Sequence, residues 1–332
     1  MDLINKEKIE RFKSVIARNY RVTRMYAEYL ERYPDLITAE MVNALTEGGE
    51  ITAEEALVAI LSEIFGLDFA IDEDRAIIMN YLTPSVRILD GEKYRSNPYY
   101  KNIKIENIRD GDWEFKLEHY PAYRGVIASD MIINSDFTEI PPLGFFTERF
   151  DFPAVLEGGN EWMTLTPVDL DTSEEAIARA HGRVVTFGLG LGYYAYMVSE
   201  KSEVESITVV ERSEEIIRLF RTHILPQFPN RHKVNIVCSD AFLYAEKVMP
   251  SENFDVAFVD TWRDPSDGEP MYMRMKPLEK LNTGTEFIYW IENFLISRHR
   301  AIRLERLLDL LDKGCDDAPE SYEKFIEEYT KI

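Results

Sequence analysis

The hydrophobic and polar positions of this chain change their period twice along its length. Through residues 4–80, apolar residues recur every three or four positions, as in "IERFKSVIARNY" and "TAEEALVAILSEIFG". This period predicts amphipathic helices. Thr52 and Glu55 have the spacing of a capping box, so a helix is expected to start there. The word "ITAE" occurs at 37 and again at 51, which predicts two helix starts and is too little for a repeat protein.

From about residue 100 to residue 168 the apolar segments are short, β-branched and aromatic. They read "NIKIENI", "WEFKLEHY" and "RGVIASDMII", and Asp-Gly at 110–111 and Pro-Pro at 141–142 interrupt this region. Such segments predict strands and hairpins. The later stretch "LEGGNEWMTLTP" predicts a turn followed by one more strand.

From residue 172 onward, apolar strands alternate with helical segments. Thr172 and Glu175 predict the start of a short helix. The predicted strands that follow are "RVVTFG", "SITVVE", "KVNIVCSD", "FDVAFVD" and "TEFIYWI", with a long amphipathic stretch at 292–313. Strands that are apolar on both faces and separated by helices are typical of βαβ units with a parallel sheet.

We therefore expect an α/β fold, with a doubly wound, mostly parallel sheet of the methyltransferase-like kind. The predicted organisation is a helical N-terminal region at 1–98, a small β-rich subdomain at 99–168 and the α/β domain at 169–332. A chain of 332 residues is long enough for about two domains.

Charge and composition restrict the partners. The net charge of −22 argues against a nucleic-acid partner, which requires a positive surface. The basic residues of 6–24 are interpreted as the solvated face of a helix. No apolar run approaches the ~18 residues of a membrane span, and "MDLINKEKIERFKSV" has no signal-peptide core. Cys238 and Cys315 lack CxxC spacing, which favours a reducing compartment. We expect a cytoplasmic protein with a small-molecule substrate and neither a nucleic-acid nor a membrane partner; the oligomeric state is left open.

The stretch "VVTFGLGLGYYAYM" places Gly188, Gly190 and Gly192 directly after the first strand of the predicted sheet. Glycines there let the chain turn tightly and let a nucleotide-like ligand approach the backbone beside a helix N-terminus. A dinucleotide fingerprint needs a small residue where this chain has Tyr193, so an NAD site is not expected. No Gly-Lys-Ser/Thr follows, which excludes a P-loop.

Three carboxylates follow the ends of the next three predicted strands. Glu211 ends "SITVVE", Asp240 ends "KVNIVCSD" and Asp260 ends "FDVAFVD". A carboxylate at the second strand is suited to ribose hydroxyls, and one at the third strand to an adenine amine. Each residue on its own is equally consistent with a helix N-terminal acid or an N-cap.

Taken together, this set resembles the class I S-adenosylmethionine-dependent methyltransferase superfamily over residues 172–291. In that family the glycine loop passes under the methionyl part and the ribose, the second-strand acid binds ribose, and the third-strand Asp holds adenine. The resemblance implies S-adenosyl-L-methionine as cofactor, with a binding set of Gly188, Leu189, Gly190, Gly192, Glu211, Arg212, Asp240, Ala241 and Asp260. The chain departs from the family at Thr186, where an acid is frequent.

The layout also resembles that of spermidine synthases, which place a small β-rich domain before the nucleotide domain and follow the fourth strand with a D-x-x-D-P loop. Here the loop reads "DTWRDPSDG", with one extra residue between Asp260 and Asp264. The resemblance implies that Asp260 or Asp264 accepts a proton. Tyr272, or Trp262, would wall the acceptor pocket.

We therefore expect a methyltransferase that uses S-adenosylmethionine and acts on a small neutral or amine-bearing acceptor. The alternatives are a spermidine-synthase-like aminopropyltransferase and a non-catalytic nucleotide-binding scaffold protein, which Thr186 favours. Trp162 and Met163 are interpreted as core residues or as an apolar lid on the cofactor. "SNPYY" at 96–100 is similar to the NPPY loop of amino-methylating enzymes but precedes the predicted sheet, so we assign it no role. The five histidines show no ligand spacing, and no metal site is expected.

Overall fold

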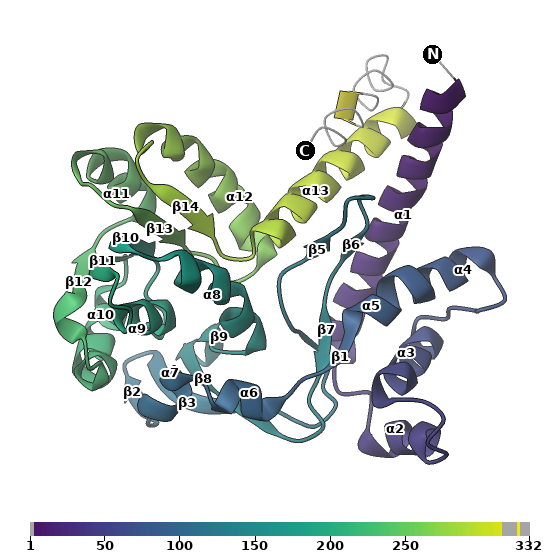
Figure 1. Ribbon diagram of the computed structural model, residues 1–332, viewed down its shortest axis with the longest axis horizontal. Helices are drawn as coiled ribbons and strands as arrows, with labels where there is room; N and C mark the ends of the chain where they lie inside the picture. Colours follow the sequence, from purple (N-terminus) through teal and green to yellow (C-terminus); the bar gives the residue numbers. More distant parts are fainter. Residues whose placement is uncertain (1–2, 314–323, 326–332) are drawn as a thin grey trace.

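The computed structural model describes residues 3–313 and 324–325, and two lobes lie at opposite ends of its long axis (Figure 1). One lobe contains the N-terminal helices, and the other contains a five-stranded sheet with its helices. Cys315 lies outside the described residues, whereas Cys238 is exposed and reduced. Within the described ranges, no helix is both long enough and apolar enough to span a membrane.

The N-terminal lobe confirms the predicted helices and both predicted helix starts. Thr38 caps α2, and Thr52 caps α3 in a capping box with Glu55. The elements are α1 (Leu3–Arg32), α2 (Ala39–Thr46), α3 (Ala53–Ile64), α4 (Asp72–Ile77), the π-helix η1 (Ile78–Leu82), α5 (Thr83–Ser85) and β1 (Val86–Ile88).

The middle of the chain forms two short helices and three small sheets. These elements are α6 (Gly91–Arg95), α7 (Pro98–Asn102), β2 (Ile108–Asp110), β3 (Trp113–Tyr120), β4 (Val126–Ile127), β5 (Ile132–Ile133), β6 (Glu139–Ile140), β7 (Leu143–Phe145), β8 (Phe150–Glu157) and β9 (Asn160–Thr164). The sheets have the orders β1-β7-β4, β2-β3-β8-β9 and β5-β6.

The predicted strands of this region are confirmed in part. "WEFKLEHY" is β3. The turn predicted in "LEGGNEWMTLTP" follows β8 and leads into β9, as predicted. The prediction over "NIKIENI" is wrong except at its end, because α7 ends at Asn102, residues 103–107 form neither helix nor strand, and β2 begins at Ile108. The Asp-Gly turn closes the β2–β3 hairpin, with Gly111 at a φ of 61°.

The α/β lobe confirms the predicted fold class. Its sheet has the order β12-β11-β10-β13-β14, and every pairing in it is parallel. The strands are β10 (Gly182–Phe187), β11 (Val204–Glu211), β12 (Val234–Cys238), β13 (Val256–Val259) and β14 (Glu286–Tyr289). The strand order reverses beside β10, because the chain runs outward to β12 and then returns to β13. The carboxyl ends of β10 and β13 therefore form the topological switch point.

The helices of this lobe are α8 (Pro167–Arg179), α9 (Tyr193–Ser199), α10 (Glu214–Leu219), α11 (Ala241–Lys247), α12 (Pro265–Met275) and α13 (Glu292–Asp312), with π-helix η2 (Phe220–Ile224) and 3₁₀ turns η3 (Leu225–Gln227), η4 (Arg231–Lys233), η5 (Met249–Ser251) and η6 (Lys276–Leu281). The predicted start of α8 at Thr172 is wrong. Thr166 and Asp169 form the capping box, with Pro167 at the first helical position, where its fixed φ suits a helix start. Thr172 lies inside the helix and bonds to the carbonyl of Val168.

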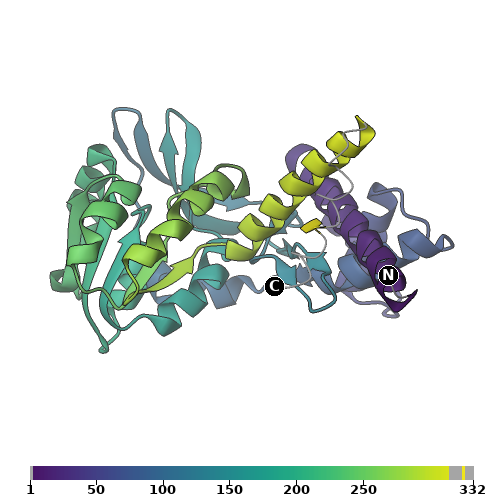
Figure 2. The ribbon, with the colours of Figure 1, turned by 90° about the horizontal axis from the view of Figure 1, so that it is seen from above.

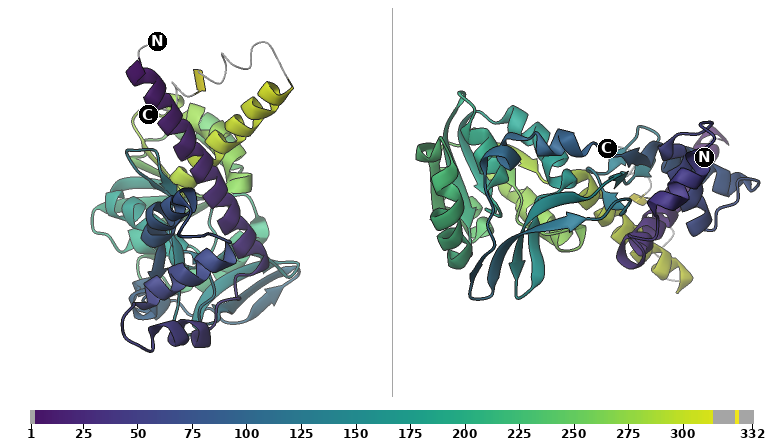
Figure 3. Two further views of the ribbon diagram at one scale, coloured as in Figure 1. Left: turned by 90° about the vertical axis from the view of Figure 1, so that its right-hand side faces the viewer. Right: turned by 90° about the horizontal axis from the view of Figure 1, so that it is seen from below.

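The buried hydrophobic residues form clusters that cross the predicted domain boundaries at 98 and 168. The domain organisation itself stays a prediction. Phe115 of β3 and Phe152 of β8 belong to the same core as the parallel sheet, whereas Leu143 and Phe145 of β7 pack with the N-terminal helices. Figure 3 shows β2, β3 and β8 alongside the α/β lobe. The residues of 99–168 thus contribute to both cores.

Helix α13 joins the two lobes. It leaves the parallel sheet and lies beside α1, as Figures 1 and 2 both show. Leu304 packs on Ile16, and the hydroxyl of Tyr20 donates to Glu305 over 2.6 Å. Because α13 contacts both lobes, it restrains their relative position.

Candidate functional site

The carboxyl edge of the parallel sheet brings together most of the residues that the sequence singles out. The amide of Leu189 donates to the carboxylate of Glu211 over 3.1 Å. The amide of Asp260 donates to the carbonyl of Phe187, at the end of β10, over 2.9 Å. The glycine loop, Glu211 and Asp260 are therefore one contiguous cluster at the switch point.

The chain itself explains each glycine of the loop. Gly188 has a φ of 99°, and a Cβ there would overlap the backbone carbonyl oxygen of Asp260. A Cβ at Gly190 would overlap the sulfur of Met163, and one at Gly192 the ring of Phe220. The glycines are thus required by close packing within the protein, so they do not by themselves establish a cofactor site.

Glu211 organises the loop from the end of β11. Its side chain is 7% exposed, and it accepts hydrogen bonds from the amides of Leu189, Arg212 and Ser213 at 2.7–3.1 Å. Two oxygens with about four lone pairs still leave acceptor capacity for a ligand hydroxyl. The carboxylate is both a structural acceptor and a candidate ribose contact.

The residues predicted to surround an adenine lie further along the same edge. Asp240 is exposed and caps α11, with its carboxylate accepting from the amide of Leu243 over 2.9 Å. Ala241 is half-buried, and Phe242 is buried beneath the guanidinium of Arg274, 3.9 Å from its ring centre. The structure therefore places Asp240 as an N-cap, and its adenine role stays a prediction.

Asp264 and Tyr272 have structural partners of their own. Asp264 caps α12 and accepts from the amide and the hydroxyl of Ser266. Although burial opposes it, hydrogen bonding from Ser266 keeps the pKa of Asp264 below its usual value. The hydroxyl of Tyr272 donates to Glu292 over 2.7 Å. These contacts favour Asp260 over Asp264 as the proton acceptor.

Asp260 has a different environment. Its carboxylate has no hydrogen-bond partner among the described residues, and the carboxyl group of Asp169 lies close enough to disfavour its ionisation. Burial, and then Asp169, raise the pKa of Asp260 well above its usual range. Both residues are half-buried.

Asp169 is the site residue that the sequence did not indicate. It is the third residue of α8 and accepts from the amide and the hydroxyl of Thr166 at 2.7–2.8 Å. Burial raises the pKa of Asp169 to about 6, against those hydrogen bonds. Among the described residues, no Lys or Arg lowers the pKa of either carboxyl group. A desolvated pair of acids without a cationic partner marks a candidate functional site.

Unpaired polar atoms continue along the chain from Asp260. The buried hydroxyl of Thr261 and the indole nitrogen of Trp262 lack hydrogen-bond partners within the described residues. Trp262 is 5% exposed. Buried polar groups are normally hydrogen-bonded, so the unmet bonding capacity of Thr261 and Trp262, next to Asp260, marks this segment as a candidate ligand contact.

Aromatic residues of α7, in the middle of the chain, bond to the glycine loop and to the segment before α8. Tyr99 donates to the carbonyl of Leu191 in the glycine loop over 2.6 Å, and Tyr100 donates to the carbonyl of Leu165. Asn97 donates to the hydroxyl of Tyr193 over 3.1 Å. "SNPYY", to which we assigned no role, therefore packs against the glycine loop and the start of α9.

Met163 contacts the glycine loop, whereas Trp162 packs against residues outside it, and the choice between core and lid stays open. The sulfur of Met163 accepts the amide of Leu191 over 3.0 Å. Trp162 packs edge-on against Trp113, and the guanidinium of Arg212 lies 5.9 Å from the Trp162 ring centre. A hollow of about 620 Å³ opens beside Trp162 and Arg212.

No cluster of three metal-ligating side chains occurs within residues 3–313 or 324–325.

Comparison with known proteins gives limited information. No protein-family model matches the chain, and no curated protein matches it. Similar solved structures include a probable spermidine synthase from Corynebacterium glutamicum, with 22% identity, a TM-score of 0.27, and coverage of 34% of this chain and 45% of that one. The spermidine synthase of Thermotoga maritima has 15% identity, a TM-score of 0.28, and coverage of 52% and 62%.

A third structure is a spermidine synthase in complex with the transition state analogue AdoDATO, with 17% identity, a TM-score of 0.28, and coverage of 49% and 57%. The matched region spans less than two thirds of each of these proteins. At such scores they carry no argument about activity.

Proposed function

We propose that this chain is a transferase that takes an S-adenosyl sulfonium compound as donor and alkylates an amine-bearing acceptor. The observation that carries the proposal is the carboxylate of Asp260, which lies at the switch point beside Asp169 without a hydrogen-bond partner among the described residues. Ligands of open α/β sheets bind at this point. A pair of acids without a cation is suited to a positively charged ligand.

Asp260 would serve as the general base. An ammonium group that enters the site supplies the missing positive charge and a hydrogen-bond donor. The raised pKa of Asp260 makes it a stronger proton acceptor than an ordinary carboxylate at neutral pH. It removes the proton, and the free amine forms the new N–C bond as the C–S bond breaks and the thioether leaves. Asp169 would accept a hydrogen bond from a second N–H group of the amine substrate.

The residues that would hold the donor are those at the neighbouring strand ends. Glu211 has acceptor capacity for ribose hydroxyls, and Thr261 and Trp262 have unmet polar atoms. The donor, when bound, supplies the electrophilic carbon. The aromatic side chains of Tyr99, Tyr100 and Tyr193 pack behind the glycine loop and would help to exclude water from the donor site.

The acidic lining favours an aminopropyl group as the one transferred. Decarboxylated S-adenosylmethionine ends in an ammonium group, whereas the carboxylate of S-adenosylmethionine would be repelled by Asp169, which is ionised above about pH 6. The alternative from the sequence is thereby preferred to methyl transfer. Methyl transfer is the second candidate because the amide of Gly190 has no acceptor in the described part of the chain and could receive that carboxylate.

Calorimetry with the full chain tests donor binding. We expect 5′-methylthioadenosine and S-adenosylhomocysteine to bind, and NAD not to bind, because Tyr193 occupies the position that a dinucleotide site keeps small. Binding of NAD alone would overturn the nucleotide assignment. Binding of none of the three would contradict the proposed donor class.

A further inference from the structure

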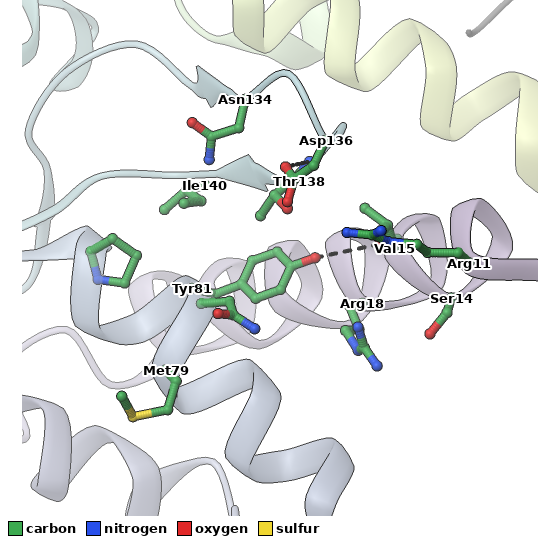
Figure 4. A pocket seen from close by; sticks show the side chains of 12 residues that line it. Arg11, Ser14, Val15, Arg18, Met79, Tyr81, Asn134, Asp136, Thr138 and Ile140 are labelled. Atoms are coloured by element: carbon green, nitrogen blue, oxygen red, sulfur yellow. Dashed lines mark hydrogen bonds between the residues drawn. The ribbon is translucent and has the colours of Figure 1, made fainter. Parts of the chain in front are cut away.

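A second hollow lies in the other lobe, away from the parallel sheet. Its volume is about 590 Å³, within the range of small-molecule sites. Its side chains come from α1, from the π-helix η1 and the following α5, and from the β5–β6 hairpin, as Figure 4 shows. π-helical segments often occur at functional sites. The mechanism proposed above uses none of these residues.

The wall of this hollow is fixed by a buried polar network. The hydroxyl of Tyr81 donates to the side-chain oxygen of Asn19 over 2.8 Å, and that oxygen also accepts the amide of Glu139. The amide nitrogen of Asn19 donates to the carbonyl of Phe137 over 2.8 Å. These bonds tie the β5–β6 hairpin to α1 and η1, so the hollow is preformed.

Several polar side chains of the hollow have no hydrogen-bond partner in the described part of the chain. They are the hydroxyl of Ser14 and the amides of Asn80 and Asn134. Their donors and acceptors are available to a polar ligand. The apolar part of the lining is Val15, Met79, Pro84 and Ile140.

Three charged side chains line this space: Arg11, Arg18 and Asp136. The guanidinium of Arg11 has no ion-pair partner within 4 Å among the described residues, whereas Arg18 is bound by both oxygens of Glu73. Although burial opposes it, hydrogen bonds from Thr138 and the charge of Arg11 hold the pKa of Asp136 below its usual value. Asp136 therefore stays ionised at neutral pH, and the two charges are available together.

We propose that this hollow binds a small zwitterion with an apolar side chain, of the free α-amino-acid class. Arg11 would receive the carboxylate and Asp136 the ammonium group. Ser14, Asn80 and Asn134 would complete the polar contacts, and the side chain would lie on Val15, Met79 and Ile140. A simple anion fits less well, because the carboxylate of Asp136 would repel it.

The experiment is calorimetry on the full chain with L-leucine, N-acetyl-L-leucine, L-leucinamide and inorganic phosphate. We expect saturable one-to-one binding of L-leucine. The acetylated compound lacks the ammonium group and the amide lacks the carboxylate, so each should bind at least tenfold more weakly. Tighter binding of phosphate than of L-leucine, or no binding of L-leucine at 10 mM (about 3 kcal/mol of binding free energy), would overturn the proposal.

Variants separate the two charges. Arg11→Gln should weaken L-leucine about tenfold and leave L-leucinamide unchanged, whereas Asp136→Asn should weaken both. Arg32→Gln is the matched control, since Arg32 lies at the other end of α1 and pairs with Glu28. Circular dichroism of each variant shows whether the fold is retained. Equal effects of all three variants, or no effect of the first two, would contradict the assignment.

Discussion

The carbonyl oxygen of Asp260 occupies the space into which a side chain at residue 188 would project. This contact joins the ends of β10 and β13 at the switch point. It also places the backbone of Asp260 directly beside the glycine loop. The position of the proposed base is thus fixed by a residue that has no side chain.

Gly188→Ala is expected to destabilise the protein by about 3 kcal/mol, because it combines a strained backbone with a backbone overlap. Gly190→Ala is the matched control, since its new Cβ meets only the flexible end of Met163. Gly190→Ala should lower the free energy of unfolding by less than Gly188→Ala does. That loss should become smaller still when it is measured in a Met163→Ala background. Urea denaturation measures all three. Equal losses for the two single variants would contradict the packing argument.

Glu211→Ala should reduce stability by roughly 2–3 kcal/mol, because the carboxylate accepts three backbone amides that would lose their partner. Donor binding should weaken as well if the remaining lone pairs hold the ribose. Glu211→Gln keeps one oxygen acceptor and should lose less of both. Denaturation and calorimetry on the same samples separate the two effects. Unchanged stability of the Ala variant would mean that the loop does not depend on this carboxylate.

Met163→Ala should strengthen binding of S-adenosylhomocysteine about fivefold, which is roughly 1 kcal/mol. The thioether sulfur now accepts the amide of Leu191 and fills the space above Gly190, so a ligand at the loop must displace it. Leu45→Ala, an exposed site in the N-terminal lobe, is the control. Weaker binding by the Met163 variant would show instead that this residue is a lid that contacts the ligand.

The burial of Asp169 should make stability depend on pH. Its folded pKa of about 6 lies above the ordinary value near 3.9, so the folded state binds more protons between those two values. Stability from this residue is therefore highest below about pH 4 and falls as the pH rises through 6, by at most ~3 kcal/mol. Lowered pKa values elsewhere act in the opposite direction. The test is the difference in unfolding free energy between wild type and Asp169→Asn at pH 4.5 and pH 7.

Asp169→Asn should gain relative to wild type as the pH rises. A difference that stays constant across this range would contradict the raised pKa of Asp169.

The periodicity of the sequence was sufficient to predict the parallel sheet. "RVVTFG", "SITVVE" and "FDVAFVD" are apolar on both faces, which only a strand covered on two sides requires. The start of α8 was missed because Thr166 and Thr172 both stand three residues before an acid. Pro167 decides between them, and this signal was present in the sequence.

The site could be predicted only where its residues follow strand ends. Glu211 and Asp260 do so, and the geometry of parallel sheets brings them together. Asp169 belongs to a helix before the first strand of the sheet, and Tyr99 to a helix in the middle of the chain. Their positions depend on how these helices pack against the parallel sheet, which no local pattern reveals. The π-helix at the second hollow is likewise set by tertiary contacts.

The most direct test of the central claim is a mass-spectrometric transfer assay with wild type and Asp260→Asn. Each is incubated with a primary diamine and either decarboxylated S-adenosylmethionine or S-adenosylmethionine. The account predicts an aminopropylated diamine and 5′-methylthioadenosine from wild type, and a loss of rate of 100-fold or more in the variant, the range of general-base catalysis. Binding of 5′-methylthioadenosine should change by less than about threefold. An alkylated product formed equally fast by Asp260→Asn, or no alkylated amine from wild type with either donor, would contradict it.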